Sequence, residues 1–146
     1  MILYLDTSSL VKIYLEESGS DLVREWVDDA EAIATSRVAY PEALSAFARR
    51  KDQGDLDARV FDLLQETLQS DWPSFVLLPL RERRAGALAV KHLLRGFDAV
   101  HLAAAFDLQD ALGSEGVIFS SFDRRLLKAA HNEGLPALGP EFADEL

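Results

Sequence analysis

Acidic side chains stand at four points of the chain where a catalytic site is commonly built. Asp6 and Asp123 each follow a short apolar run and precede a helical pattern. Asp98 opens a very apolar helical segment, and Glu42 lies in the first or second turn of another. If the apolar runs are parallel strands, several of these acids meet at one edge of a sheet, where open α/β sheets bind their ligands.

Carboxylates that converge in this way repel one another, which raises their pKa values unless a cation neutralises them. Hard divalent cations with oxygen ligands, Mg²⁺ or Mn²⁺, suit such a site. The chemistry they support is metal-assisted hydrolysis, in which water is activated and the charge on a phosphoryl group is stabilised.

Each acid also has a simpler structural interpretation. Asp6, Asp98 and Asp123 are all good N-caps for the helices that follow them. Glu42 near a helix start favours the helix dipole and lies away from the apolar stripe of its helix. The spacing of the acids alone therefore leaves both a metal site and a set of helix-start residues open.

The three histidines are expected to play other roles. His101 follows Asp98 by one helical turn, and a packed or hydrogen-bonded histidine is favoured there, because oxygen-rich sites seldom include imidazole. His92 and His131 lie among charged residues and are predicted to be at the surface.

Alternating apolar runs and helical patterns predict one α/β domain over residues 1–146, with a mainly parallel sheet of four to five strands flanked by helices. The predicted strands are 2–5, 32–35, 75–78 and 117–119, with a short fifth strand within 135–138. The first of these strands ends at Asp6, which places that residue at the carboxyl edge of the sheet.

Composition excludes some classes of protein and leaves others open. The absence of cysteine excludes disulfides and thiolate metal sites and fits a reducing compartment. The net charge of −10 argues against sequence-independent binding to nucleic acid, which normally needs a basic surface. It leaves a phosphodiester substrate open, because bound divalent cations reverse the local field. With neither a signal-like N-terminus nor an apolar run of membrane length, a cytoplasmic protein without membrane contact is expected.

Four segments form a recognisable set: Leu5-Asp6-Thr7-Ser8, Glu42, Phe-Asp-Ala-Val-His-Leu-Ala-Ala-Ala at 97–105 and Ser-Phe-Asp-Arg-Arg-Leu at 121–126. This set resembles a PIN domain, and within that family the VapC-type toxins of bacterial and archaeal toxin–antitoxin pairs. It covers nearly the whole chain, and no acidic position departs from the family pattern.

The resemblance implies a divalent-metal-dependent endoribonuclease that hydrolyses RNA phosphodiester bonds with Mg²⁺ or Mn²⁺. Asp6 and Asp98 would be the principal metal ligands, and Asp123 and Glu42 would complete the acidic pocket directly or through water.

The resemblance also assigns supporting roles and partners. Ser8 and Ser121 match small polar positions that orient the carboxylates or bound water. A homodimer and a cognate antitoxin that occupies the pocket are further implications.

Two other functions remain open from the sequence. A phosphatase of the haloacid-dehalogenase type also places an aspartate after its first strand, but its second aspartate would stand where Ser8 is found. A catalytically inactive PIN-like scaffold is the second alternative, and the intact set of acids favours an enzyme over it. No motif of aromatic and basic residues identifies the RNA target.

Overall fold

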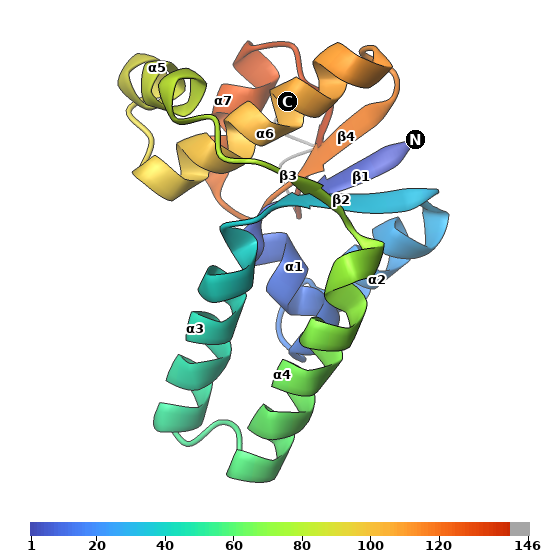
Figure 1. Cartoon of the computed structure of the whole chain (residues 1–146), viewed down its shortest axis with the longest axis vertical. Helices are drawn as coiled ribbons and strands as arrows, with labels where there is room; N and C mark the ends of the chain where they lie inside the picture. The colour runs from blue at the N-terminus through green and yellow to red at the C-terminus, as the bar shows by residue number, and fades with distance from the viewer. Residues whose placement is uncertain (141–146) are drawn as a thin grey trace.

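A five-stranded parallel sheet separates two layers of helices in the computed structural model, which describes residues 1–140 (Figure 1). The strands are β1 (Ile2–Leu5), β2 (Ala32–Ser36), β3 (Val76–Leu78), β4 (Val117–Ser120) and β5 (Ala137–Leu138). The helices are α1 (Thr7–Tyr14), α2 (Ser20–Asp29), α3 (Ala39–Asp52), α4 (Ala58–Asp71), α5 (Glu82–His92), α6 (Gly96–Leu112) and α7 (Arg124–Asn132), with a 3-10 turn η1 (Trp72–Ser74) after α4.

The strand order is β3-β2-β1-β4-β5, so the first strand lies in the middle of the sheet. The chain runs outward from β1 through β2 to β3, and then returns to form β4 on the opposite side of β1. The order therefore reverses between β1 and β4, and ligands of open α/β sheets bind outside the carboxyl ends of strands at such a point. Leu5 pairs with Ser120, which brings these two strand ends level.

Side chains that alternate along β1 pack into two separate hydrophobic cores, one on each face of the sheet. Leu3 and Leu5 are fully buried in the core formed with α1 to α4, and Tyr4 is fully buried in the core formed with α5 to α7. A parallel strand covered on both faces reads as a continuous apolar run, because neither set of alternate side chains meets water. The predicted α/β class and the mainly parallel sheet are confirmed.

Helices α3 and α4 form a long hairpin that projects away from the sheet (Figure 1). Gly54 has φ of +85° in the turn between them, a left-handed conformation that glycine adopts without strain. Asp57 caps α4 by accepting the N–H of Val60 at 2.8 Å. The sheet end of α3 carries Glu42, and Arg49 lies two turns further out along the same helix.

Two local predictions differ from the structure. Helix α6 begins at Gly96 with Arg95 as its N-cap, so Asp98 lies inside the first turn and is not the cap. His92 is not at the surface: its side chain is only 12% exposed, because its Nε2 lies 2.8 Å from Oε1 of Glu133 at the end of α7. The end of the predicted domain, from 141 to 146, lies outside the described residues. Within residues 1–140 no helix has both the length and the apolarity needed to cross a membrane.

Candidate active site

Asp6 is a buried carboxylate at the carboxyl end of β1, with only 3% of its surface exposed. Its Oδ1 accepts the backbone N–H of Ser9 at 2.9 Å and the hydroxyl of Ser8 at 2.7 Å. Its Oδ2 accepts the hydroxyl of Ser121 at 2.6 Å. The bond to Ser9 makes Asp6 the N-cap of α1. The capping interpretation of Asp6 is therefore confirmed for Oδ1. Because Oδ2 faces Ser121 at the end of β4, capping does not exclude a role in the site, which stays a prediction.

Burial raises the pKa of Asp6 above its ordinary value. The nearby His101 and the hydrogen bonds from Ser121, Ser8 and Ser9 oppose this rise without cancelling it. A carboxylate whose negative charge is disfavoured in this way is stabilised by a neighbouring positive charge.

Asp98, from α6, is the second acid of this region. Burial is the largest cause of its raised pKa, and the negative charges of Asp123 and Asp6 raise the pKa further. Arg95 lies nearby, with its Nε 3.8 Å from Oδ2 of Asp98, and partly offsets that repulsion. Acids from β1, α6 and the end of β4 therefore interact electrostatically at the carboxyl edge of the sheet.

Asp123 is the N-cap of α7 and accepts the N–H of Leu126 at 3.1 Å. Its own backbone N–H donates to Oγ of Ser121 at 3.0 Å. Since Ser121 also donates to Asp6, one hydroxyl connects the segments that carry Asp6 and Asp123.

Glu42 enters the site from α3 and is held by two donors. Its Oε1 accepts the Thr7 hydroxyl at 2.6 Å and lies 2.9 Å from Nε2 of His101. Burial, the largest single effect, raises the pKa of Glu42, but the hydrogen bonds from His101 and Thr7 together lower it below its ordinary value. The surroundings therefore shift the pKa values of these two acids in opposite directions, down for Glu42 and up for Asp98.

His101 is 1% exposed and hydrogen-bonded on both ring nitrogens. Its Nδ1 lies 2.8 Å from the Tyr4 hydroxyl, while its Nε2 faces Glu42 and lies 3.0 Å from Oγ1 of Thr7. In the neutral ring, a proton on Nε2 serves Glu42 and leaves Nδ1 to accept from Tyr4. The prediction of a hydrogen-bonded histidine is confirmed, whereas the roles of Thr7 and Tyr4 were missed. Thr7 lies within the Leu-Asp-Thr-Ser segment and offered a signal, but Tyr4 lies in an apolar strand and offered none.

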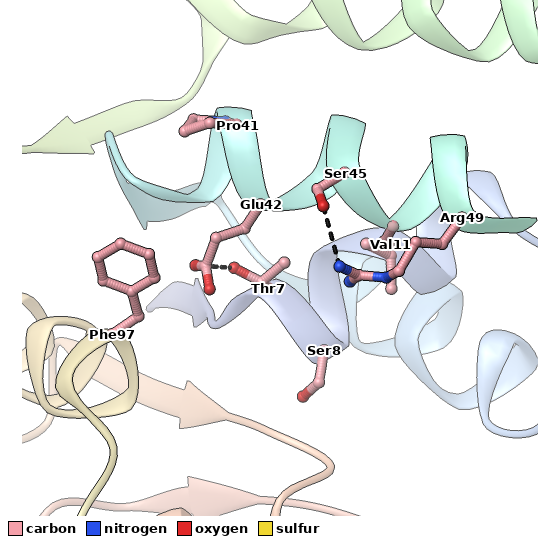
Figure 2. Close-up of a pocket in the computed structure, with 9 residues that line it drawn as sticks. Thr7, Ser8, Val11, Pro41, Glu42, Ser45, Arg49 and Phe97 are labelled. Atoms are coloured by element: carbon pink, nitrogen blue, oxygen red, sulfur yellow. Dashed lines mark hydrogen bonds between the residues drawn. The ribbon is translucent and has the colours of Figure 1, made fainter.

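Two hollows open beside these acids. One, of about 450 Å³, is lined by Glu42, Arg95, Gly96, Phe97 and Asp98. The other, of about 530 Å³, is shown in Figure 2 and is lined by Thr7, Ser8, Val11, Pro41, Glu42, Ser45, Ala46, Arg49 and Phe97. Because Glu42 and Phe97 line both hollows, the second hollow continues the first away from Asp98.

The donor set fits a hard cation in its chemistry. Asp6, Asp98 and Asp123 offer carboxylate oxygens, and a positive charge among them would relieve the repulsion that raises the pKa of Asp98. In the part of the chain that the structure describes, no three acidic, histidine or cysteine side chains are arranged to hold one ion as they stand. The assignment of Asp6, Glu42, Asp98 and Asp123 as ligands stays a prediction, as do the supporting roles of Ser8 and Ser121.

The parallel α/β sheet, with interacting acids at its carboxyl edge, is the arrangement expected for a PIN domain. Residues 3–132 match the PIN domain family, and the chain belongs to that family. The predicted resemblance is thus confirmed.

Named relatives and solved structures extend the comparison. Ribonuclease VapC49 of Mycobacterium tuberculosis (strain ATCC 25618 / H37Rv) is 38% identical over 143 residues, which cover 91% of this chain and 92% of the relative. Ribonuclease VapC47 of Mycobacterium tuberculosis (strain CDC 1551 / Oshkosh) is 28% identical over 145 residues, 95% of this chain and 97% of the relative.

Among solved structures, FitAcB from Neisseria gonorrhoeae superposes with a TM-score of 0.65 at 20% identity, covering 94% of this chain and 96% of that one. VapBC2 from Rickettsia felis, bound to a DNA fragment from their promoter, gives a TM-score of 0.61 at 12% identity, covering 96% of this chain and 99% of that one. At these identities the two structures support the fold alone.

Proposed function

We propose that this protein is an endoribonuclease, the toxin of a toxin–antitoxin pair, and that Mg²⁺ or Mn²⁺ assists it in hydrolysing RNA phosphodiester bonds. The observation that carries the proposal is the electrostatic coupling of Asp98 to Asp6 and Asp123 at the point where the strand order reverses. The relatives named as ribonucleases support the choice of RNA as substrate.

Asp6 and Asp98 are the proposed principal ligands, and Asp123 and Glu42 complete the pocket directly or through water. A bound divalent ion would supply an activated water and would neutralise charge on the phosphoryl group. The acids by themselves would repel a phosphodiester, so the proposal requires positive charge among them.

The chain's own residues hold these acids in place. Ser8, Ser9 and Ser121 fix the carboxylate of Asp6 in one orientation, and a ligand oriented before the ion arrives loses less entropy on binding. Thr7 and His101 hold the carboxylate of Glu42 by hydrogen bonds, and Glu42 lines the hollow that it shares with Asp98.

The phosphatase alternative requires Asp6 as a nucleophile and an acid two residues later. That second position is Ser8, whose hydroxyl donates to Asp6 and accepts the N–H of Phe122 at 2.9 Å. Both carboxylate oxygens of Asp6 already accept hydrogen bonds within the protein. The arrangement favours Asp6 as a fixed ligand over Asp6 as an attacking group.

We also propose a cognate antitoxin that occupies the acidic pocket, and a homodimer. The likeness to the VapC relatives supports a partner protein. Exposed apolar side chains at the end of α5, Val90 and Leu93, support a protein contact at that surface. We propose that the protein acts in the cytoplasm, where it would meet its RNA substrate.

The proposed function is tested by incubating the purified protein with RNA in EDTA, in Mg²⁺ and in Mn²⁺, with p-nitrophenyl phosphate as the phosphomonoester substrate. We expect RNA cleavage only with a divalent ion, and none by Asp98→Asn purified in parallel, which controls for contaminating nucleases. Cleavage that persists in excess EDTA would overturn the metal requirement. Phosphomonoester hydrolysis without RNA cleavage would favour the phosphatase, and neither activity with either ion would favour the inactive scaffold.

A further inference from the structure

The groove in Figure 2 runs along one face of α3, away from the acids. Glu42, Ser45, Ala46 and Arg49 recur at three- and four-residue spacing, which places them on one side of the helix. From Glu42 to Arg49 this face extends about 10 Å, at the ordinary rise of an α-helix. The groove is therefore long enough to continue a strand of substrate past the acidic site.

Phe97 stands on the opposite wall at the acidic end of the groove. It belongs to α6, and Figure 2 shows its ring beside Glu42 and across from α3. The side chain is 57% exposed although it directly precedes Asp98. An exposed aromatic face offers a base a stacking surface, which is the sequence-tolerant way in which proteins hold single-stranded RNA.

Arg49 supplies the positive charge among the residues that line this groove. Its guanidinium donates to Oγ of Ser45 at 2.9 Å, which directs it over the groove (Figure 2). Within residues 1–140 no acidic side chain forms an ion pair with Arg49, so most of its donors remain available. In a protein of net charge −10, such an arginine in a groove that leads away from an acidic site complements the charge of a phosphate.

We infer that this groove is a subsite for a single-stranded RNA nucleotide next to the scissile bond, with its base stacked on Phe97 and a phosphate bound by Arg49. The inference rests on the proposed RNA hydrolysis and adds the path of the strand and the residues that hold it. Duplex RNA does not expose base faces, so a stacking wall selects an unpaired strand.

The test measures binding without hydrolysis, so that it does not depend on the enzyme activity. The probe is a fluorescein-labelled ten-residue single-stranded RNA of mixed sequence. It is titrated with full-length protein in Ca²⁺, a hard cation that carboxylates bind, and followed by fluorescence anisotropy at several salt concentrations. A gel after each titration verifies that the RNA is intact. Arg49→Ala should weaken binding and lower the slope of log K against log salt by about 0.7, the value for one lost phosphate contact with a single strand. Arg49→Lys should keep the slope.

Phe97→Ala should weaken binding by about 5- to 150-fold, the range for one stacked base, and leave the salt slope unchanged. Phe97→Trp keeps an aromatic ring at this position and should bind the RNA about as well as wild type does. A ten-residue abasic strand keeps the phosphates and lacks the bases. On that strand Phe97→Ala should have no effect, while Arg49→Ala should still lower the slope.

The controls are matched in exposure and chemistry. Arg83→Ala removes an exposed arginine from α5, and Leu63→Ala removes a side chain that is 60% exposed, close to the value for Phe97, from α4. Neither should change binding. Because Arg49 and Phe97 are both exposed, their variants should melt within a few degrees of wild type.

Wild-type affinity and salt slope in both Arg49→Ala and Phe97→Ala would overturn the subsite and leave the groove to a protein partner. If that result accompanied metal-dependent RNA cleavage, the proposed function would stand and only the subsite would fail. If instead the variants behaved as expected but no RNA was cleaved with either ion, the subsite would stand and the enzymatic proposal would fail.

Discussion

Ser121 Oγ lies 2.6 Å from Oδ2 of Asp6 and donates a hydrogen bond to it, although 115 residues separate the two positions. The bond exists because β1 and β4 are neighbours whose ends are level, with Leu5 opposite Ser120. The same Oγ accepts the backbone N–H of Asp123 at 3.0 Å. One hydroxyl therefore links two of the acidic segments.

Ser121→Ala should remove this link and leave Oδ2 of the buried Asp6 without its donor. We expect the free energy of unfolding to fall by about 1–3 kcal/mol, the usual cost of an unsatisfied buried acceptor. We expect kcat/KM for RNA to fall by about 10- to 100-fold, as for other residues that orient metal ligands. Urea denaturation in EDTA and RNA cleavage in Mn²⁺ measure the two effects.

The control for this change is Ser70→Ala, because Ser70 is an exposed serine in the last turn of α4, outside the segments that carry the acids. It should alter neither quantity. Wild-type kcat/KM in Ser121→Ala would show that Asp6 does not need this donor for catalysis.

Tyr4→Phe should affect the site through His101. The Tyr4 hydroxyl holds Nδ1 of His101 as an acceptor, which leaves the proton on Nε2 for Glu42. Without that hydroxyl the ring is free to place its proton on Nδ1, and Glu42 then loses a donor. We expect lower activity and a coupling energy of about 0.5–3 kcal/mol between Tyr4→Phe and Glu42→Gln in a double-mutant cycle of unfolding.

Tyr14→Phe provides the matched control. The Tyr14 hydroxyl donates to Oδ2 of Asp71 at 2.8 Å, and Asp71 is not one of the four acids of the site. It should lower stability without lowering RNA cleavage. Additive effects of Tyr4→Phe and Glu42→Gln on stability would show that His101 does not transmit the effect of Tyr4.

The sequence was sufficient for features that depend on local order. Apolar runs ending in Asp6 and in Ser120-Ser121 marked β1 and β4, because a buried parallel strand needs a continuous apolar stretch. The position of Asp6 at the carboxyl edge followed from the same pattern. The sequence left open whether Asp6 is a helix cap or a site residue. The structure confirms the cap through Oδ1, while Oδ2 accepts from Ser121, so the role in the site stays a prediction.

Features that depend on distant pairs were not visible in the sequence. The contact of Tyr4 with His101 joins positions 97 apart, and that of His92 with Glu133 joins positions 41 apart. Phe97 and Arg49 form no local motif. Helices α6 and α3 belong to different cores, and only the fold brings the two residues to the lining of one groove. Helical periodicity also placed the start of α6 at Asp98, because Gly96 and Phe97 carry no capping signal that would mark the earlier start.

The protein should be a homodimer that uses the end of α5. Val90 and Leu93 are 80% and 77% exposed, which is unusual for adjacent large apolar side chains on a monomer. Val90→Glu combined with Leu93→Asn should give a monomer by light scattering at micromolar concentration. Asparagine suits position 93, where φ is +56°.

Leu63→Glu, at an exposed position of α4, should leave the mass of the assembly unchanged. A wild-type protein that is already monomeric at this concentration would contradict the dimer. A double variant that remains dimeric would place the contact elsewhere.

Asp98→Asn should separate the roles of this residue in catalysis and in stability. Burial and the charges of Asp123 and Asp6 raise the pKa of Asp98 in the folded protein, whereas the same residue in the unfolded chain has a pKa of about 3.9. Between these two pKa values the folded state binds more protons than the unfolded state, so this residue makes the metal-free protein less stable as pH rises. The Asn variant has no carboxyl group at this position and therefore does not lose stability in this way as pH rises.

In EDTA, the melting temperature of Asp98→Asn relative to wild type should therefore increase as pH rises from about 4, and level off above the folded pKa of Asp98. Asp62→Asn, an exposed position of α4, should show no such trend. Glu42→Gln should show the opposite trend, because the hydrogen bonds from His101 and Thr7 lower the pKa of Glu42, and its contribution to stability is lost as pH falls.

In EDTA at neutral pH, Asp98→Asn should melt at a higher temperature than wild type, and addition of Mn²⁺ should reverse this order. The ion should raise the melting temperature of wild type and scarcely change that of the Asn variant, because one carboxylate fewer weakens the binding of a hard cation. RNA cleavage by the variant should fall by orders of magnitude. Asparagine would serve about as well as aspartate if residue 98 only favoured the start of α6. An Asn variant with wild-type cleavage and an unchanged response to Mn²⁺ would therefore reduce Asp98 to a helix-start residue, whatever its stability in EDTA.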